Sequence, residues 1–536
     1  YAVCAMLAAL LSISLPAIKH SRVTIVNLKQ QNALKKKSLW EKLFLDVILL
    51  GISLYGYYSF RKSAGSISET VLSGRSLDPL LYLSSSLFIL GAGMFFLRLQ
   101  PLIVRLIYFC VKRFLGPAGY ISFMENMKNG RKMQLIMLFL VMTVSLGIFH
   151  ATVARTIVEN AVENREYLDG SDAVILENWP MMQDQNGTPT GQYLEPDPSK
   201  YLEMDFADAQ TRVYYDDRAY IRKERNSRTS LTIMAIHTKE FGKMTDLPSD
   251  VNPKAYYTYL NELADVEKGV LLSRNFETVE GIKIGDEISY YNTDGKAVTC
   301  TVVDFIDYFP SYSPKITVIN PDGNADTSDN FLIVANYAYL KKVLGLKPYE
   351  VWVDMKDGAS SDELYDFMTD HSMRLRKYVN KSDDIEKTIT DPLLQGTNGI
   401  LTLGFAVTIL LCAVGYLIYW IMSIRGRELI FGVLRASGFH KGEIVTMLIG
   451  EQIFCGVFSI LAGIGIGRLT SKMFVPILQA SYATSEQVLP MRLITNAEDL
   501  YRLYGIVASV MLICIVLLII LLFRMNVTKA LKIGEE

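Results

Sequence analysis

The sequence feature that most limits the fold of this chain is a set of long apolar runs. A helix needs about 20 mostly apolar residues to cross the hydrocarbon core of a bilayer. Seven runs approach or reach that length, at 2–17, 43–60, 80–97, 133–152, 399–424, 444–467 and 504–523. The run at 43–60 is the weakest, because it is short and contains Asp46. The sequence therefore predicts an α-helical transmembrane bundle of about seven spans.

Charge divides the chain into two oppositely charged parts. Residues 151–391 hold 42 of the 55 acidic and 26 of the 54 basic residues, a net charge of −16, and the rest of the 536 residues carry +15. The mean hydropathy of the whole chain is nevertheless positive, at +0.22. Apolar blocks that alternate with a polar block exclude a disordered or fibrous chain and argue against a wholly soluble enzyme.

The positions of Lys and Arg predict how the chain is oriented in the membrane. Cytoplasmic flanks of membrane spans carry an excess of these residues. Basic clusters follow the first run, separate the third from the fourth and the fifth from the sixth, and follow the last run. With seven crossings all four clusters fall on one side, although Arg61, Lys62 and Arg75 fall on the other. The acidic block at 153–395 is then extracytoplasmic.

This outer block has the pattern of an α+β domain, which we expect to contain two subdomains. His237 and His371 are isolated, and no spacing resembles a metal-ligand set or a catalytic triad. We therefore expect the block to act by binding or by moving. The expected strands lie at 173–176, 270–272, 287–291, 298–306, 315–319, 331–335 and 351–353, and the expected helices at 253–267, 337–344 and 361–378.

The sixth run contains residues that indicate close helix packing. Gly463 and Gly467 are four residues apart, and Gly456 precedes them. Small residues at this spacing let two membrane helices approach closely. Glu451 is an acidic residue in the same run, and we expect it to face other helices or the cytoplasmic side. Because few ionisable residues lie within the runs, an ion-driven carrier is a weak alternative.

The segment between the fifth and sixth runs, at 425–443, is short, basic and partly apolar. Ile430, Val433 and Leu434 can form one face of a short helix that docks in a partner's groove. The alternative is an ordinary interfacial turn whose charges only set the topology. The chain has no phosphate-binding loop of the GxxxxGK[ST] type, so any ATPase must lie in another subunit or outside the sequence in hand.

These residues resemble the FtsX-like/MacB-type permeases of ABC transporters, in which one span, a large outer domain and three spans follow one another. The similarity covers residues 117–536 and is carried by three stretches, at 425–443, at 269–286 and at 125–131. The resemblance implies that the 425–443 loop couples the chain to an ATPase. Its matching residues are Glu428, Gly432, Val433, Leu434, Arg435, Ala436 and Gly438, and Glu451 also matches a family position. Arg427, which we expect near the rim of the short helix, is counted with the coupling loop.

Residues 1–40 suggest an internal repeat, because Val23-Thr24 and Leu28-Lys29 resemble Val527-Thr528 and Leu531-Lys532. The chain is thus similar to a larger, two-repeat branch with ten spans, and we expect most of the first repeat to precede Tyr1. The resulting division is a last span of the first repeat (1–17), a basic segment with two connecting spans (18–116), an elbow and span (117–152), the outer domain (153–395) and a three-span permease domain (396–536).

The resemblance implies a permease subunit in a bacterial cell membrane that exports, extracts or senses an amphiphile, such as a peptide antibiotic or a lipid-linked compound. ATP and Mg²⁺ are expected on a partner ATPase, with no cofactor and no enzymatic activity in this chain. Further expected partners are membrane lipids and an extracellular peptide, lipid or protein, but no nucleic acid. The alternative is a non-transporting scaffold of the cell-division FtsX type, which would regulate an extracellular protein.

Overall fold

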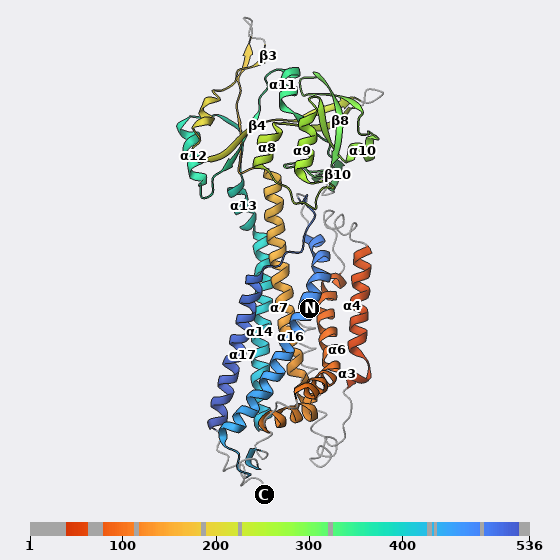
Figure 1. The fold of residues 1–536 in the computed structure, drawn as a ribbon, viewed down its shortest axis with the longest axis vertical. Helices are drawn as coiled ribbons and strands as arrows, with labels where there is room; N and C mark the ends of the chain where they lie inside the picture. Colours follow the sequence, from red (N-terminus) through yellow and green to blue (C-terminus); the bar gives the residue numbers. More distant parts are fainter. Residues whose placement is uncertain are drawn as a thin grey trace.

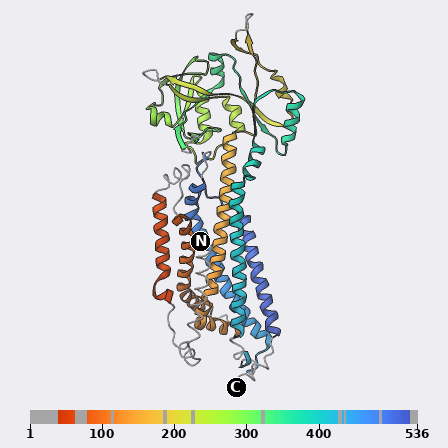
Figure 2. The ribbon, with the colours of Figure 1, turned by 180° about the vertical axis from the view of Figure 1, so that it is seen from behind.

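The computed structural model describes residues 39–62, 79–111, 117–183, 189–222, 228–319, 325–425, 431–433, 437–482 and 487–524. The molecule is elongated, with a bundle of long helices at one end and a domain rich in β-strands at the other (Figure 1). A single helix, α7, runs from the bundle into the outer domain, and the view from behind shows the same connection (Figure 2).

The bundle is built from long helices, and α4 and α6 lie on the side opposite α17 (Figure 1). The helices are α3 (Leu39–Lys42), α4 (Leu45–Lys62), α6 (Pro79–Val111), α7 (Pro117–Asp169), α14 (Pro392–Arg425), α16 (Lys441–Tyr482) and α17 (Ala497–Arg524). A partly buried ion pair joins α4 to α6, where Arg98 Nη2 lies 2.6 Å from Asp46 Oδ1. The guanidinium of Arg98 also stacks over Phe44.

Within the described ranges, five helical segments are long and apolar enough to cross a membrane. They are Leu83–Leu106, Met133–Asp169, Pro392–Ile424, Gly442–Pro476 and Ala497–Ile520. The predicted run at 43–60 does form a helix, α4, but its charged ends keep it out of this group. The run at 2–17 lies outside the described residues. A helical membrane bundle is therefore supported, whereas the predicted number of seven spans is not confirmed.

Helix α7 crosses the predicted boundary between membrane span and outer domain. It has 53 residues and continues without a break from the predicted elbow to Asp169. The sheet of the outer domain begins only at Ala173, so the boundary predicted at 153 lies inside a helix. A continuous helix is a stiffer connection than the separate span that the sequence suggested.

The outer domain is organised around one nine-stranded sheet with the strand order β13-β1-β12-β4-β5-β11-β6-β8-β7. Strand β7 also pairs with β4 through Tyr220 and Tyr291, so the six strands from β4 to β7 close on themselves. The strands are β1 (Ala173–Glu177), β2 (Met181–Gln183), β3 (Pro189–Tyr193), β4 (Ala207–Arg222), β5 (Arg228–Ile236), β6 (Gly269–Ser273), β7 (Glu287–Tyr291), β8 (Ala297–Ile306), β9 (Lys315–Ile319), β10 (Ala325–Asp329), β11 (Leu332–Asn336), β12 (Glu350–Met355) and β13 (Leu375–Asn380).

Short helices cover the sheet and connect it to the bundle. They are η1 (Ser199–Glu203), α8 (Thr238–Met244), α9 (Tyr256–Asp265), α10 (Asn275–Glu280), α11 (Tyr337–Leu344), α12 (Ser361–Asp370) and α13 (Lys381–Ile389). Residues of α8 and α9, such as Phe241 and Leu263, form a buried core against one face of the sheet. A second core, which includes Val302 and Leu340, fills the other face.

All seven predicted strands are confirmed, and the α+β character of the outer domain with them. One expectation was wrong, because the helix predicted at 361–378 ends at Asp370 and is followed by strand β13. The sheet has two parts, the closed set of strands from β4 to β7 and the strands β13, β1 and β12. The two parts share the 16-residue strand β4, which pairs with β12 along one half and with β5 along the other.

Candidate functional site

The described part of the predicted coupling loop is held against the bundle by aromatic side chains. Phe431 is 3% exposed and belongs to the same buried cluster as Trp420, and Phe439 packs on that cluster. Val433 is 55% exposed, so this apolar side chain is free to meet a partner. Gly432 is buried. The other predicted loop residues, Arg427, Glu428, Leu434, Arg435 and Ala436, lie outside the described residues, and their roles stay predictions.

The loop turns into α16 through a tight set of backbone contacts. Gly438 has a φ of +99°, a conformation that favours glycine because it has no Cβ. The carboxylate of Glu443 accepts a hydrogen bond from the backbone N–H of His440 at 2.9 Å, as in one half of a capping box. This arrangement fixes the direction in which α16 leaves the loop.

The glycines of α16 face neighbouring helices at short distances. A Cβ on Gly463 would lie 2.7 Å from Cβ of Val144, and one on Gly467 would lie 3.0 Å from Cβ of Ile148, both on α7. A Cβ on Gly456 would lie 2.7 Å from Met511 of α17. Helix backbones approach this closely only where a side chain is missing. The backbones of α16 and α7 are thus in close contact.

Glu451 is buried within the bundle, with 1% of its surface exposed. Cys455, one turn further along α16, contacts Met133 of α7 at 3.2 Å. Residues four apart share one face of a helix, so Glu451 is on the α7 side of α16. It therefore faces other helices.

Above the bundle, the segment before α17 is bound to one face of α7. Residues 487–496, here called the strap, run along that face. Thr156 hydrogen-bonds both backbone groups of Ile494, with Oγ1–O and N–Oγ1 distances of 3.1 and 3.2 Å. Asn160 does the same for Arg492, at 2.8 Å for both bonds. The side chains of Thr156 and Asn160 thus pair with the backbone of the strap in the way that the backbone of a neighbouring β-strand would.

A third side chain of α7, Asn164, also binds the strap: its Oδ1 accepts hydrogen bonds from the N–H groups of Val488 (2.8 Å) and Leu489 (3.2 Å). Thr156, Asn160 and Asn164, here called the ladder, are spaced by four residues and are all at least 94% buried. Buried backbone groups that lose their partners are costly, so the ladder fixes the strap to α7.

The two ends of the strap are attached to different parts of the molecule. Leu489 inserts into the core of the outer domain, and Arg492 forms an ion pair with Asp250 of that domain. At the other end, Arg155 of α7 binds the first turn of α17 through two hydrogen bonds to Asp499, of 2.8 and 3.1 Å. A bidentate guanidinium–carboxylate pair is both strong and directional.

The end of α7 is enclosed by the outer domain. The hydroxyl of Tyr167 donates to the carbonyl of Tyr312 at 2.5 Å and accepts from the N–H of Phe309 at 3.2 Å. Gly170 ends the helix with a φ of +78°, and a Cβ there would lie 2.6 Å from the ring of Trp352. A side chain at this position would meet both a strained backbone and a steric clash.

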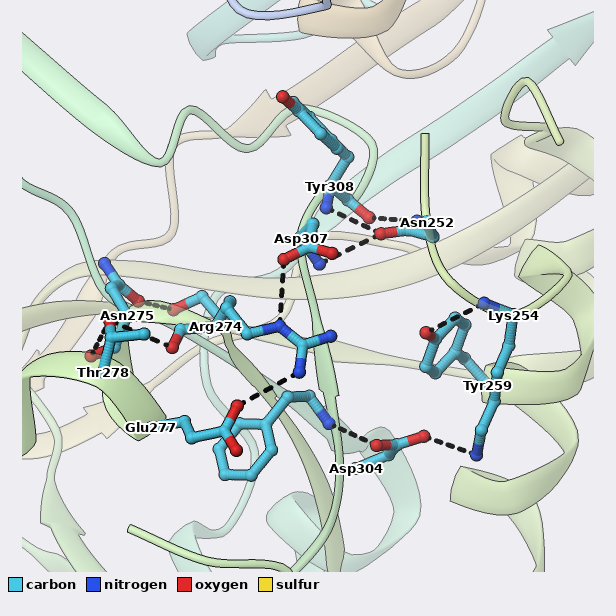
Figure 3. A network of polar contacts seen from close by, with 12 residues as sticks. Asn252, Lys254, Tyr259, Arg274, Asn275, Glu277, Thr278, Asp304, Asp307 and Tyr308 are labelled. Atoms are coloured by element: carbon cyan, nitrogen blue, oxygen red, sulfur yellow. Dashed lines mark hydrogen bonds and ion pairs between the residues drawn. The ribbon is translucent and has the colours of Figure 1, made fainter. Parts of the chain in front are cut away.

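A polar network stiffens the loop that contacts Tyr167 (Figure 3). Oδ1 of Asn252 accepts from the N–H groups of Asp307 (3.0 Å) and Tyr308 (2.9 Å), and its amide donates back to the carbonyl of Tyr308. Arg274 Nε binds the carboxylate of Asp307 at 3.0 Å. The ring of Tyr308 packs edge-on against Tyr167.

The charged side chains of this network form ion pairs with other side chains of the outer domain. Lys254 lies 2.6 Å from Asp304 (Figure 3). It also lies 2.7 Å from Glu262. The hydrogen bond to Asp304, and then that to Glu262, raises the pKa of Lys254. In the part of the chain that the structure describes, no group of three or more His, Cys, Asp or Glu residues could hold a metal ion.

A second connection links the outer domain to α14. Arg165 of α7 forms ion pairs with Asp169 on its own helix and with Asp384 of α13, the latter at 3.0 Å. Helix α13 ends at Ile389, and α14 begins at Pro392. The start of α14 is thus tied to α7 as well.

Together, these contacts form a junction between the bundle and the outer domain, which consists of α7, the strap and α13. Sequence reasoning did not identify the Thr156–Asn160–Asn164 ladder. The sequence does contain a pattern that could have indicated the ladder. Three uncharged polar residues at four-residue spacing lie on one face of a helix, just beyond an apolar run. Their partners, however, are more than 300 residues away in the sequence, and only the fold brings them together.

The family comparison concerns the helices and the loop on one side of this junction. Residues 402–529 match the model of the FtsX-like permease C-terminal domain. This region of the chain is similar to FtsX-like permeases. The match includes most of α14, the predicted coupling loop, α16, the strap and all of α17, so the predicted resemblance is confirmed for this region. Together with the five long apolar helices, the match indicates a membrane protein.

Other comparisons add little to this assignment. No curated protein matches the chain. The extracellular domain of the ABC-type transporter YknZ from Gram-positive bacteria is 11% identical, and the match covers 38% of this chain and 100% of that one. A domain of a protein described as a permease of Porphyromonas gingivalis is 13% identical, with coverages of 38% and 82%. Both TM-scores are 0.22, too low to say what the outer domain does.

Proposed function

We propose that this chain is the permease subunit of an ABC transporter in a bacterial cell membrane. In this proposal a separate ATPase binds ATP and Mg²⁺, and its closure moves the helices of the permease domain. The outer domain moves with them and acts on an amphiphile, such as a peptide antibiotic or a lipid-linked compound, which is exported, extracted or sensed.

The observation that carries the proposal is the junction. α16 packs closely on α7, α17 is bound to α7 through Arg155 and Asp499, and the strap between them reaches the core of the outer domain through Leu489. A displacement of α16 or α17 must therefore move the strap, α7 or both. Because α7 is continuous to Asp169, the displacement is passed to the outer domain.

On this proposal the loop at 425–443 is the contact with the ATPase. Among the described loop residues, Val433 is an exposed apolar side chain, and the resemblance adds Glu428 and Arg435 as polar contacts. An apolar anchor with charges around it is typical of a short helix that docks in a groove. Phe431 and Phe439 would carry force from this contact to the bundle, since both pack on its core.

Paired variants test the loop and the ladder separately. The chain is co-expressed with a candidate partner ABC ATPase and placed in lipid nanodiscs. Arg435→Ala with Glu428→Ala is expected to lose the stimulation of ATP turnover by the permease and to weaken co-purification, while the ATPase alone keeps its basal rate. Ser437→Ala, a change at an exposed residue of the same loop, serves as the matched control and is expected to have no effect.

The ladder variant Asn160→Leu should act differently. It is expected to keep the ATPase bound and ATP turnover near normal, but to reduce the ATP-dependent motion of the outer domain, measured as a change in distance between spin labels on that domain and on α17. The matched control is Glu166→Leu at an exposed position on the same helix. Unchanged ATP turnover in the loop variants would contradict coupling through the loop. ATP-driven motion without any action on an amphiphile would favour the scaffold alternative.

A further inference from the structure

The outer domain has a cavity of its own, where β4 and β12 meet the beginning of α8. Its volume is about 350 Å³, which is within the range of about 300–1,000 Å³ that is typical of small-molecule sites. β4 supplies Arg212, α8 supplies Glu240, and β12 supplies Val351. Leu202 of η1 also lines the cavity and is 81% exposed, so the cavity is open to solvent.

An aromatic ring holds Arg212 in this cavity. The guanidinium carbon of Arg212 lies 4.9 Å from the centroid of the Tyr349 ring. A guanidinium that stacks on an aromatic face keeps the N–H groups at its edge available for other contacts. The side chain of Arg212 is 39% exposed, so these N–H groups are accessible from the cavity.

Arg212 donates no hydrogen bond from its guanidinium to any residue that the structure describes. It forms an ion pair with Glu195, but the distance of 3.8 Å to Oε1 is too long for a hydrogen bond. That oxygen already accepts a hydrogen bond of 2.5 Å from the hydroxyl of Tyr349. An accessible guanidinium with free donors is suited to a bidentate contact with a planar anion such as a carboxylate.

The other titratable side chains of the lining limit the charge of the occupant. Burial lowers the pKa of His237, so its imidazole is neutral at pH 7. Among the described lining residues, Arg212 is then the one positive charge, and Glu240, which is exposed, carries a negative charge. A single positive charge next to a negative one favours a carboxylate over the dianion of a phosphate monoester, and it favours a ligand that also has a positive group.

We propose that this cavity binds the C-terminal carboxylate of a peptide. The carboxylate forms a bidentate contact with Arg212, the last apolar side chain covers Leu202, and a basic residue further along the peptide lies toward Glu240. The net charge of −16 on residues 151–391 also attracts a basic peptide. This binding goes beyond the proposed function, because it does not depend on an ATPase that moves the outer domain.

Saturation-transfer NMR on the chain in nanodiscs tests the site, because this method detects weak binding to a large particle. The probe is the tripeptide Lys-Ala-Leu with a free carboxylate, the control is the same tripeptide with a C-terminal amide, and empty nanodiscs give the background. The acid is expected to bind roughly tenfold more tightly, since the amide lacks the charged hydrogen-bond acceptor. Norleucine in place of the lysine should weaken the acid about twofold, because Glu240 is exposed.

Arg212→Gln should remove the preference for the acid over the amide. The matched control is Arg222→Gln, because Arg222 lies on the same strand and stacks over Tyr291 at 4.4 Å but lies outside the cavity. Arg212→Lys keeps the charge without the planar fork and should keep only part of the preference. An unchanged thermal midpoint shows that each variant folds, and the comparison of acid with amide on the unaltered protein needs no variant.

Equal binding of the acid and the amide, no detectable binding of either, or a preference that persists in Arg212→Gln would overturn the proposal. Displacement of the acid by inorganic phosphate at lower concentrations than by acetate would also overturn it, because the cavity would then select a phosphate group. None of these outcomes depends on ATP, so a failure here is distinguishable from a failure of the loop and ladder variants.

Discussion

Gly170 shows how much a single position can contribute to the junction. It has the left-handed backbone that ends α7, and it lies beneath the ring of Trp352 with no room for a Cβ. Trp352 in turn packs against Phe241 in the core of the outer domain. At the residue scale, the stability of the junction therefore depends on a missing side chain.

Gly170→Ala is expected to destabilise the outer domain by about 1–3 kcal/mol, because strain at a positive φ adds to a steric clash. Thermal unfolding followed by tryptophan fluorescence measures the loss. Gly358→Ala is the matched control, since Gly358 also has a positive φ, of +88°, but nothing lies within 4 Å of its would-be Cβ. Equal losses in the two variants would show that packing against Trp352 is unimportant.

Asp354 is expected to make the stability of the outer domain depend on pH. Burial, and then the nearby charge of Asp172, raises the pKa of Asp354 from its ordinary value of 3.8 to about 6. The folded state thus binds a proton more tightly than the unfolded state. The cost of ionising Asp354 is absent below about pH 4, appears as the pH rises, and is complete above pH 6.

Asp354→Asn removes this ionisation. The variant should be more stable than the unaltered protein at pH 7, and the difference should vanish near pH 4. Unfolding in urea at a series of pH values measures the effect. Asp357→Asn, at an exposed position just beyond β12, is the control. A gain that is the same at every pH would refute the assignment.

At the scale of helices, the contact between α16 and α7 combines backbone proximity with polar bonds. Gly463 and Gly467 bring the two backbones together, and Ser145 of α7 donates a hydrogen bond to the carbonyl of Gly463 at 3.0 Å. The sequence spacing of these glycines predicted close packing. It did not predict that the partner would be α7, which is separated from α16 by the whole outer domain.

Gly463→Val is expected to lower stability by about 1–3 kcal/mol, since added atoms at a tight contact force the helices apart. Gly465→Val is an internal control, because Gly465 lies on the same helix and a Cβ there meets nothing within 4 Å. Thermal midpoints in a mild detergent compare the two. A larger loss in Gly465→Val would contradict the packing shown by the structure.

At the scale of the whole molecule, the outer domain and the coupling loop lie at opposite ends of the bundle (Figure 1). They are connected by α7, by the strap and by α13 with α14. The sheet and the loop are thus linked through packed helices. The proposed function requires these two ends to lie on opposite sides of the bilayer.

Labelling of single cysteines in intact cells tests that requirement. Asp217→Cys, at a side chain that is 70% exposed on the outer domain, should react with a membrane-impermeant maleimide from outside. Ser437→Cys in the loop should react only after the cells are permeabilised. Cys300, Cys412, Cys455 and Cys514 are buried, and all six native cysteines are replaced in the background protein. The reverse pattern of labelling would overturn the assigned orientation.

The sequence by itself determined the features that depend on local patterns. Apolar runs predicted long helices, because a membrane span needs a minimum length of apolar residues. Alternating residues and turn signals predicted seven strands of the outer domain, because strand side chains alternate between two faces. Loop motifs predicted an FtsX-like permease domain. The 16-residue strand β4 was missed, since its polar residues, such as Asp216 and Asp217, hide the alternation.

The tertiary structure alone decided which of these elements act together. The ladder on α7 has ordinary polar residues, and its meaning comes from backbone groups of the strap more than 300 residues away. The cavity beside Arg212 is formed by β4, α8 and β12, which come from distant parts of the chain. Hydrogen bonds and packing act over a few ångströms in space, whereas a sequence records only neighbours along the chain. That difference is why the junction became visible only in the folded molecule.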